Sequence, residues 1–136
     1  MADPSQKHGG SIDDAVHRFL VDEVDTVPEI EALLLIWESR PKHWTAEELA
    51  ERLFVDIGTV RSILAKLAKR QLITAGPERP ALYSFQPRSP EADGLIEAVA
   101  TAYRRDLVRA TTIIHSKASQ AVREFARAFR LTKDGN

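Results

Sequence analysis

The polar residues best suited to bind a ligand lie between Asp56 and Arg79. Seven hydroxyl and cationic side chains recur there: Thr59, Arg61, Ser62, Lys66, Lys69, Arg70 and Arg79. Lys and Arg bind phosphate oxygens, Arg can donate two hydrogen bonds to one guanine, and Ser and Thr hydroxyls reach phosphates or base edges. The pattern indicates an anion-binding surface, with double-stranded DNA as the candidate ligand.

Residue types that serve catalysis or metal binding do not gather into a motif. The histidines, at positions 8, 17, 43 and 115, have no paired carboxylate at ligand spacing, and the chain has no Cys. Neither Gly9-Gly10 nor Gly58 builds a phosphate-cradling loop. The acidic residues of positions 13 to 25 fall largely on a solvent face, whereas general acid–base catalysis needs a buried carboxylate. The sequence therefore predicts no enzyme, no metal site and no cofactor.

Two helix-start signals precede the polar residues. Thr45 and Glu48 have the spacing of a capping box and open a short helix. Asp56 is suited to cap a second helix, from about Ile57 to Gln71. Apolar residues recur along one side of that helix, namely Val60, Ile63, Leu64 and Leu67.

Other elements follow from similar patterns. Pro28 fits the first turn of an apolar helix over residues 29–39. Residues 72–75 and 81–85 read as strands joined by a turn rich in Gly and Pro, a β-hairpin. The sequence thus predicts a mainly α domain with a small β-hairpin over residues 26–88. It also predicts a flexible tail over 1–10 and a helix over 11–25 that Ser11 opens.

Residues 45–85 resemble the winged helix-turn-helix of bacterial transcriptional regulators of the MarR-like and PadR-like kinds. Three stretches carry the likeness: Thr45, Glu48, Leu49 and Ala50, then Val55 to Arg61, and finally Leu64, Leu67, Leu72, Ile73 and Tyr83-Ser84-Phe85. The resemblance implies that residues 56–70 form a recognition helix in the major groove of DNA, with Arg61 on a guanine or a phosphate. It implies phosphate contacts for Lys66, Lys69 and Arg70, and a minor-groove contact for Arg79 at the wing tip.

An alternative stays open. Residues 26–87 carry eight basic and eight acidic side chains, whereas a DNA-binding domain usually has a basic surface. Winged helices also serve as protein-binding modules, here an adaptor for polymerase or a sensor protein without DNA affinity. A third hypothesis places a small ligand near Trp37, Trp44 and Tyr103.

Residues 91–131 predict long helices with one broad apolar stripe. The helix is expected to pause near residues 116–119, with Ser119 capping a last helix that includes Phe129 and Arg130. This end of the chain looks like that of small uncharacterised bacterial winged-helix proteins. The resemblance implies a homodimer joined through this segment, with six candidate contact residues: Leu95, Ile96, Val99, Tyr103, Leu107 and Ile114. Packing of the segment on residues 11–24 of the same chain is the alternative.

Length and hydropathy bound these expectations. The chain has 136 residues and a net charge of -1, enough for one compact domain with extensions. Its longest strongly apolar run, over residues 32–37, is far shorter than the roughly 20 residues of a membrane span. A signal-peptide pattern is absent from the polar first residues, so a cytoplasmic bacterial protein is expected.

Overall fold

The computed structural model describes the backbone of residues 13–134, and the side chains of this range except those of 118–121 and 129–134. The chain divides into two compact units. One is Val27–Thr101, and the other joins the residues up to Thr26 with those from Ala102 onward. No helix within the described part is long and apolar enough to cross a membrane.

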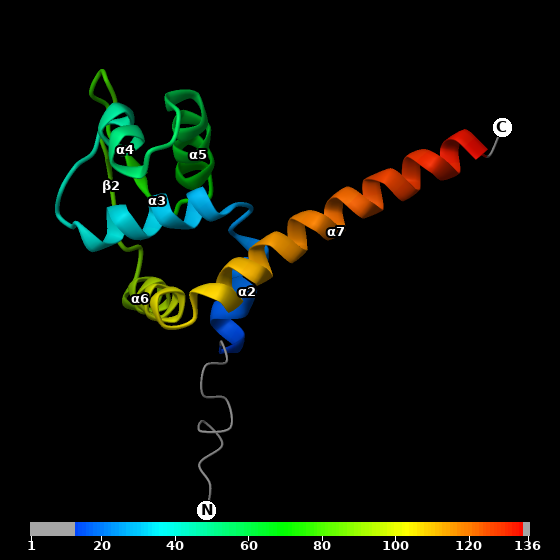
Figure 1. Cartoon of the computed structure of the whole chain (residues 1–136). Coiled ribbons are helices and arrows are strands. Elements are labelled where there is room, and N and C mark those ends of the chain that lie inside the picture. Colours follow the sequence, from blue (N-terminus) through cyan, green and yellow to red (C-terminus); the bar gives the residue numbers. More distant parts are fainter. Residues whose placement is uncertain (1–12, 135–136) are drawn as a thin grey trace, which may run out of the picture. The chain divides into compact units, whose positions relative to one another are not determined.

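The unit Val27–Thr101 has a mainly helical fold with a small antiparallel sheet. It holds helices α3 (Val27–Glu38), α4 (Ala46–Leu53) and α5 (Ile57–Lys69), strands β1 (Thr74–Ala75) and β2 (Tyr83–Ser84), and most of α6 (Pro90–Arg105). Helix α3 packs against α4, α5 and β2, and lies below α4 and α5 in Figure 1. This is a winged helix-turn-helix, as the sequence predicts.

The core of this unit comes from apolar residues at helical spacing. Ile30, Leu33 and Ile36 of α3 have no exposed surface, and Leu49 of α4 is likewise fully buried. On α5 the buried residues are Val60, Ile63, Leu64 and Leu67. Burying each such side chain stabilises the fold by roughly 1.5–3 kcal/mol, so the inner side of α5 is fixed and its outer side is left to solvent.

The sheet has a third participant that the sequence patterns do not predict. Trp44 pairs with Tyr83 across an antiparallel bridge, with N–H to O=C distances of 2.8 and 2.7 Å in the two directions. The Trp44 indole also donates to the Ser39 hydroxyl at 2.8 Å. The segment before α4 is thereby tied to the returning strand of the wing.

Helix α6 is attached to α3 through Asp93. Its Oδ1 atom accepts hydrogen bonds from Trp37 Nε1 at 2.9 Å and from Arg40 Nη1 at 2.8 Å. The Arg40 guanidinium lies 4.6 Å from the centre of the Trp37 ring and 5.6 Å from that of Phe85. The two hydrogen bonds to Asp93, one of them charge-assisted, therefore hold the start of α6 in place, and the cation–π contacts position the Arg40 guanidinium.

The second unit is built from α2 (Asp14–Asp22) and α7 (Leu107–Asp134), which pack on each other. Val16, Phe19 and Leu20 of α2 are buried, as are Ala110 and Ile114 of α7. Lys117 of α7 donates to the Val24 carbonyl and to Asp25 Oδ1, both at 3.0 Å. The packing on residues 11–24 that the sequence left as an alternative is therefore present within one chain.

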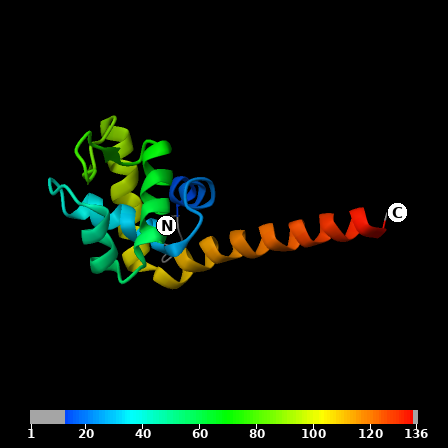
Figure 2. The ribbon, with the colours of Figure 1, turned by 90° about the horizontal axis from the view of Figure 1, so that it is seen from above.

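Two predicted boundaries are wrong. Helix α7 runs without a pause through residues 116–119, as Figures 1 and 2 show. The break falls instead at Asp106, between α6 and α7, where the carboxylate accepts the Arg109 amide at 3.4 Å and ends one helix while opening the next. Helix α2 begins after Asp13, which accepts the Ala15 and Val16 amides. Ser11, the predicted tail of residues 1–10, and the Phe129 and Arg130 side chains lie outside the described residues.

Candidate nucleic-acid interface

Helix α5 presents a polar outer side from its first turns onward. Thr59, Arg61 and Ser62 are exposed there, whereas the adjacent positions Val60 and Ile63 are buried. A helix fits the B-DNA major groove, and residues of its first turns reach base edges. The predicted recognition residues therefore share one accessible surface.

Asp56 fixes the start of this helix. Its Oδ2 accepts the Thr59 amide at 2.9 Å, and its Oδ1 accepts the Thr59 hydroxyl at 2.7 Å. These two hydrogen bonds, the hydroxyl bond most of all, hold the pKa of Asp56 below its ordinary value. The cap is therefore ionised at neutral pH, and Thr59 donates to it in this conformation.

A capping box likewise fixes the start of α4. The Thr45 hydroxyl accepts the Glu48 amide at 3.1 Å, and Glu48 Oε1 accepts the Thr45 amide at 2.9 Å. The hydrogen bond from the Thr45 amide keeps the pKa of Glu48 below its usual range. The positive charge of Lys42 lowers this pKa further, by a smaller amount. Lys42 Nζ lies 3.8 Å from Glu48 Oε2.

Arg61 is paired with a carboxylate from the neighbouring helix. Its Nη2 atom lies 3.6 Å from Glu47 Oε2, and the two side chains are 63% and 55% exposed. An exposed pair of this kind contributes about 0.2–1 kcal/mol to stability, so it reorganises easily. Nothing in the local sequence pattern singles out Glu47, because the contact joins two helices.

The other predicted cations of α5 differ from one another. Lys66 Nζ lies 3.1 Å from Glu29 Oε2, a carboxylate on α3 that is 2% exposed. Lys69 is exposed, whereas Arg70 is half-buried at the end of the helix. Lys66 would therefore have to share its charge between Glu29 and a phosphate, while Lys69 faces solvent.

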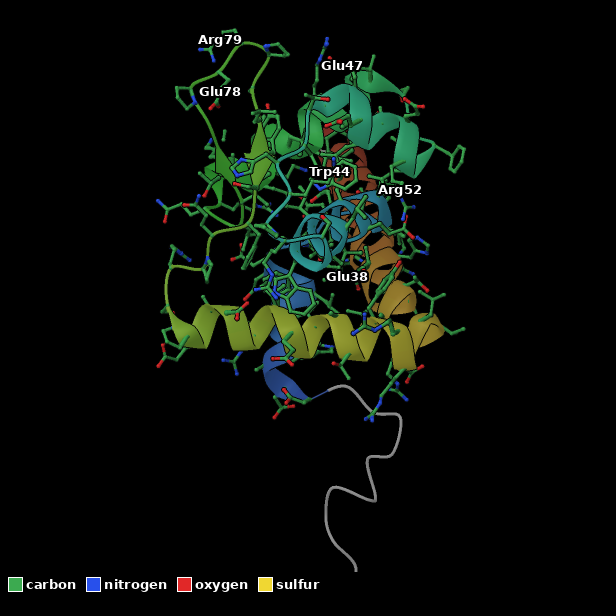
Figure 3. The ribbon with its side chains drawn as sticks, turned by 90° about the vertical axis from the view of Figure 1, so that its left-hand side faces the viewer. Glu38, Trp44, Glu47, Arg52, Glu78 and Arg79 are labelled. Atoms are coloured by element: carbon green, nitrogen blue, oxygen red, sulfur yellow. The ribbon has the colours of Figure 1, made fainter. Side chains whose placement is uncertain are left out.

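Arg79 lies at the tip of the wing beside Glu78 (Figure 3). Its Nη1 donates to the Glu78 carbonyl at 3.0 Å and to the Pro77 carbonyl at 3.3 Å. The guanidinium is thus folded onto its own turn and remains exposed. Figure 3 shows Glu47 toward the same end of this unit as the wing tip.

The predicted dimer residues are mostly covered within a single chain. Ile96, Val99 and Ile114 are at most 3% exposed, Leu95 and Tyr103 are half-buried, and Leu107 is 49% exposed. Three other apolar side chains of α7 are more exposed than Leu107: Val108 at 76%, Val122 at 68% and Phe125 at 74%. These residues belong to the same apolar stripe that the sequence shows over residues 91–131. The stripe alone does not reveal which of its residues α2 covers.

The turn between α4 and α5 carries an exposed aromatic ring. Phe54 is 94% exposed and has a left-handed backbone, with φ of 58°. Together with Trp44, Glu48, Glu51 and Arg52 it borders an open groove of about 510 Å³. Among the side chains that the structure describes, no three of the His, Asp or Glu type lie together as metal ligands would.

Comparison with known proteins adds structural likeness without close sequence similarity. No protein-family model matches the chain, and no curated protein sequence matches it significantly. A mutant of ZitR from Lactococcus lactis superposes with a TM-score of 0.51 at 20% identity, over 85% of this chain and 79% of that one. A probable transcriptional regulator from Pseudomonas aeruginosa gives 0.51 at 19% identity, over 92% and 90%.

MepR, a transcription regulator of the Staphylococcus aureus multidrug efflux pump MepA, also gives a TM-score of 0.51. It is 14% identical, and the match covers 97% of this chain and 94% of that one. These neighbours are MarR-type winged-helix transcription regulators. At such low identity the likeness establishes the fold, which is the winged helix with added terminal helices.

Proposed function

We propose that the chain is a DNA-binding transcription regulator that acts as a homodimer, with α5 in the major groove. The observation that carries the proposal is the outer side of α5. Thr59, Arg61 and Ser62 are exposed in its first turns, on a helix whose opposite side is locked into the core. The transcription regulators with the same fold support the assignment.

The charges near α5 shape this proposal. Glu47 and Asp56 place negative charge beside Arg61 and at the helix start. Non-specific binding to the phosphate backbone should therefore be weak, and affinity should depend on a small number of base contacts. A duplex of the right sequence would bind far better than a random one.

The homodimer rests on α7. Val108, Val122 and Phe125 remain 68–76% exposed on this helix, and large apolar surfaces are usually covered by a partner. A second copy with two-fold symmetry would cover the same residues on both chains and present two α5 helices to successive major grooves. Of the six residues predicted from sequence, Leu107 is the exposed one that would join them.

The test is a fluorescence-anisotropy titration of the chain, at low and moderate salt, against duplexes enriched from a random-sequence library with the wild-type protein. Wild type should bind at low salt and lose affinity steeply as salt rises, because phosphate contacts release counterions. Arg61→Ala should weaken binding, while Arg18→Ala, an exposed arginine on α2, should leave it unchanged. No binding at low salt would overturn the proposal.

One observation favours a second function, a protein-binding winged helix without DNA affinity. Phe54 exposes nearly its whole ring in a backbone conformation that costs roughly 1–2 kcal/mol for a residue with a side chain. Strain of this kind is commonly retained where the residue has a role. This function predicts a co-purifying protein whose binding is lost in Phe54→Gly and kept in Arg61→Ala.

A further inference from the structure

The pairing of Arg61 with Glu47 brings a donor and an acceptor together on the proposed DNA-binding surface. The two groups come from different helices of the helix-turn-helix, α5 and α4, and lie 3.6 Å apart with both side chains more than half exposed. Among the described residues, Arg61 is the only charged group within ion-pair distance of Glu47. The surface thus offers a guanidinium and a carboxylate side by side.

The carboxylates of Asp56 and Glu48 are already committed to hydrogen bonds at the helix starts. Asp56 accepts the amide and hydroxyl of Thr59, and Glu48 accepts the amide of Thr45. Glu47 makes no such capping bond within the described chain and keeps 55% of its side chain exposed. It is therefore the acidic group near α5 that can turn to an external donor.

Stability gives little reason for the Glu47–Arg61 contact, because exposed ion pairs contribute little and are screened by salt. DNA offers a matching partner. The major-groove edge of a G·C base pair presents guanine O6 and N7 as acceptors beside the N4 amine of cytosine as a donor. An arginine binds the guanine atoms through two N–H groups, and a carboxylate accepts from the cytosine amine.

We infer that Arg61 and Glu47 together read one G·C base pair, Arg61 donating to the guanine and Glu47 accepting from the cytosine. Glu47 is then a specificity-determining residue supplied by the first helix of the motif. Its charge weakens binding to phosphates generally and favours the one base pair that supplies a donor. The inference rests on the proposed DNA-binding function.

The test begins by enriching short duplexes from a random library with the full-length wild-type chain. Single base-pair changes in the enriched duplex are then titrated by fluorescence anisotropy against wild type, Glu47→Ala and Arg61→Ala. Glu51→Ala is the matched control, since it removes another exposed carboxylate of α4. Circular dichroism of each variant confirms that the fold is kept.

Wild type should prefer G·C at one position by about tenfold or more, the usual scale of a good base contact. Both Glu47→Ala and Arg61→Ala should lose most of that preference at the same position, while Glu51→Ala should retain it. If Glu47→Ala instead binds every duplex more tightly by one common factor, the carboxylate only repels phosphates. That result overturns the inference and leaves the DNA-binding proposal standing. Failure of wild type to bind any duplex at low salt overturns both.

Discussion

Replacing Lys66 with Met tests how α5 is held against α3. Lys66 Nζ lies 3.1 Å from a carboxylate oxygen of Glu29, whose side chain is 2% exposed, while the Lys66 side chain is 39% exposed. A hydrogen bond to a charged group contributes about 1.5–3 kcal/mol, and removing one partner leaves the buried group poorly solvated. Partial exposure of Lys66 moves the expected loss to the lower limit of that range or slightly below it, about 1–2 kcal/mol.

The assay is urea unfolding followed by circular dichroism, with thermal melting alongside. Lys66→Met should lower the free energy of unfolding by about 1–2 kcal/mol, which for a chain of this size lowers Tm by about 3–8 °C. The matched control is Lys69→Met, an exposed lysine on the same helix, with an expected change within about 0.5 kcal/mol.

A double-mutant cycle with Glu29→Gln isolates the pair from other effects of each change. Glu29→Gln combined with Lys66→Met should destabilise by less than the two single effects added together, with a coupling free energy of about 1 kcal/mol. Additive effects, or a Lys66→Met variant as stable as Lys69→Met, would refute the view that the buried carboxylate anchors α5 through Lys66.

Three further outcomes are expected. Phe54→Gly should raise the free energy of unfolding by about 0.5–1 kcal/mol, since the left-handed strain is relieved and the 94% exposed ring loses no core contact; a less stable variant in urea would contradict this. The stability advantage of wild type over Asp56→Ala should be complete at neutral pH. This advantage should shrink below about pH 4, because a lowered pKa in the folded state means that stabilisation is lost as protons bind. A difference in the free energy of unfolding, measured in urea, that stays constant from about pH 7 to pH 3 would contradict this. Val122→Glu with Phe125→Glu should convert a wild-type dimer to monomer in analytical ultracentrifugation, whereas Arg123→Gln should leave the dimer intact; a double variant that stays dimeric would rule out this part of α7 as the interface.

Local signals in the sequence predicted the helix starts that define the winged helix. The Thr45–Glu48 capping box and the Asp56 cap involve residues three positions apart, so the type and spacing of the side chains are sufficient evidence. The apolar periodicity of α5 likewise identified its buried side, and hence the accessible positions Thr59, Arg61 and Ser62.

Contacts between distant segments could not be predicted in the same way. Glu29 and Lys66 are 37 positions apart, and the Trp44–Tyr83 bridge joins segments on either side of α4 and α5. Periodicity predicts that a lysine is on the surface of a helix, but the partner depends on how the helices pack. The boundary at Asp106 was missed for a related reason, since the apolar stripe continues across it while the carboxylate caps the next helix.

The most direct test of the account is the salt dependence of DNA affinity for wild type and Arg61→Ala, measured by anisotropy on one duplex. Affinity should fall steeply with salt, and Arg61→Ala should bind more weakly at every salt concentration, with a salt slope smaller by about one if the arginine also contacts a phosphate. Equal affinity of the two proteins at all salt concentrations, or no binding at low salt, would contradict the claim that the outer side of α5 binds DNA.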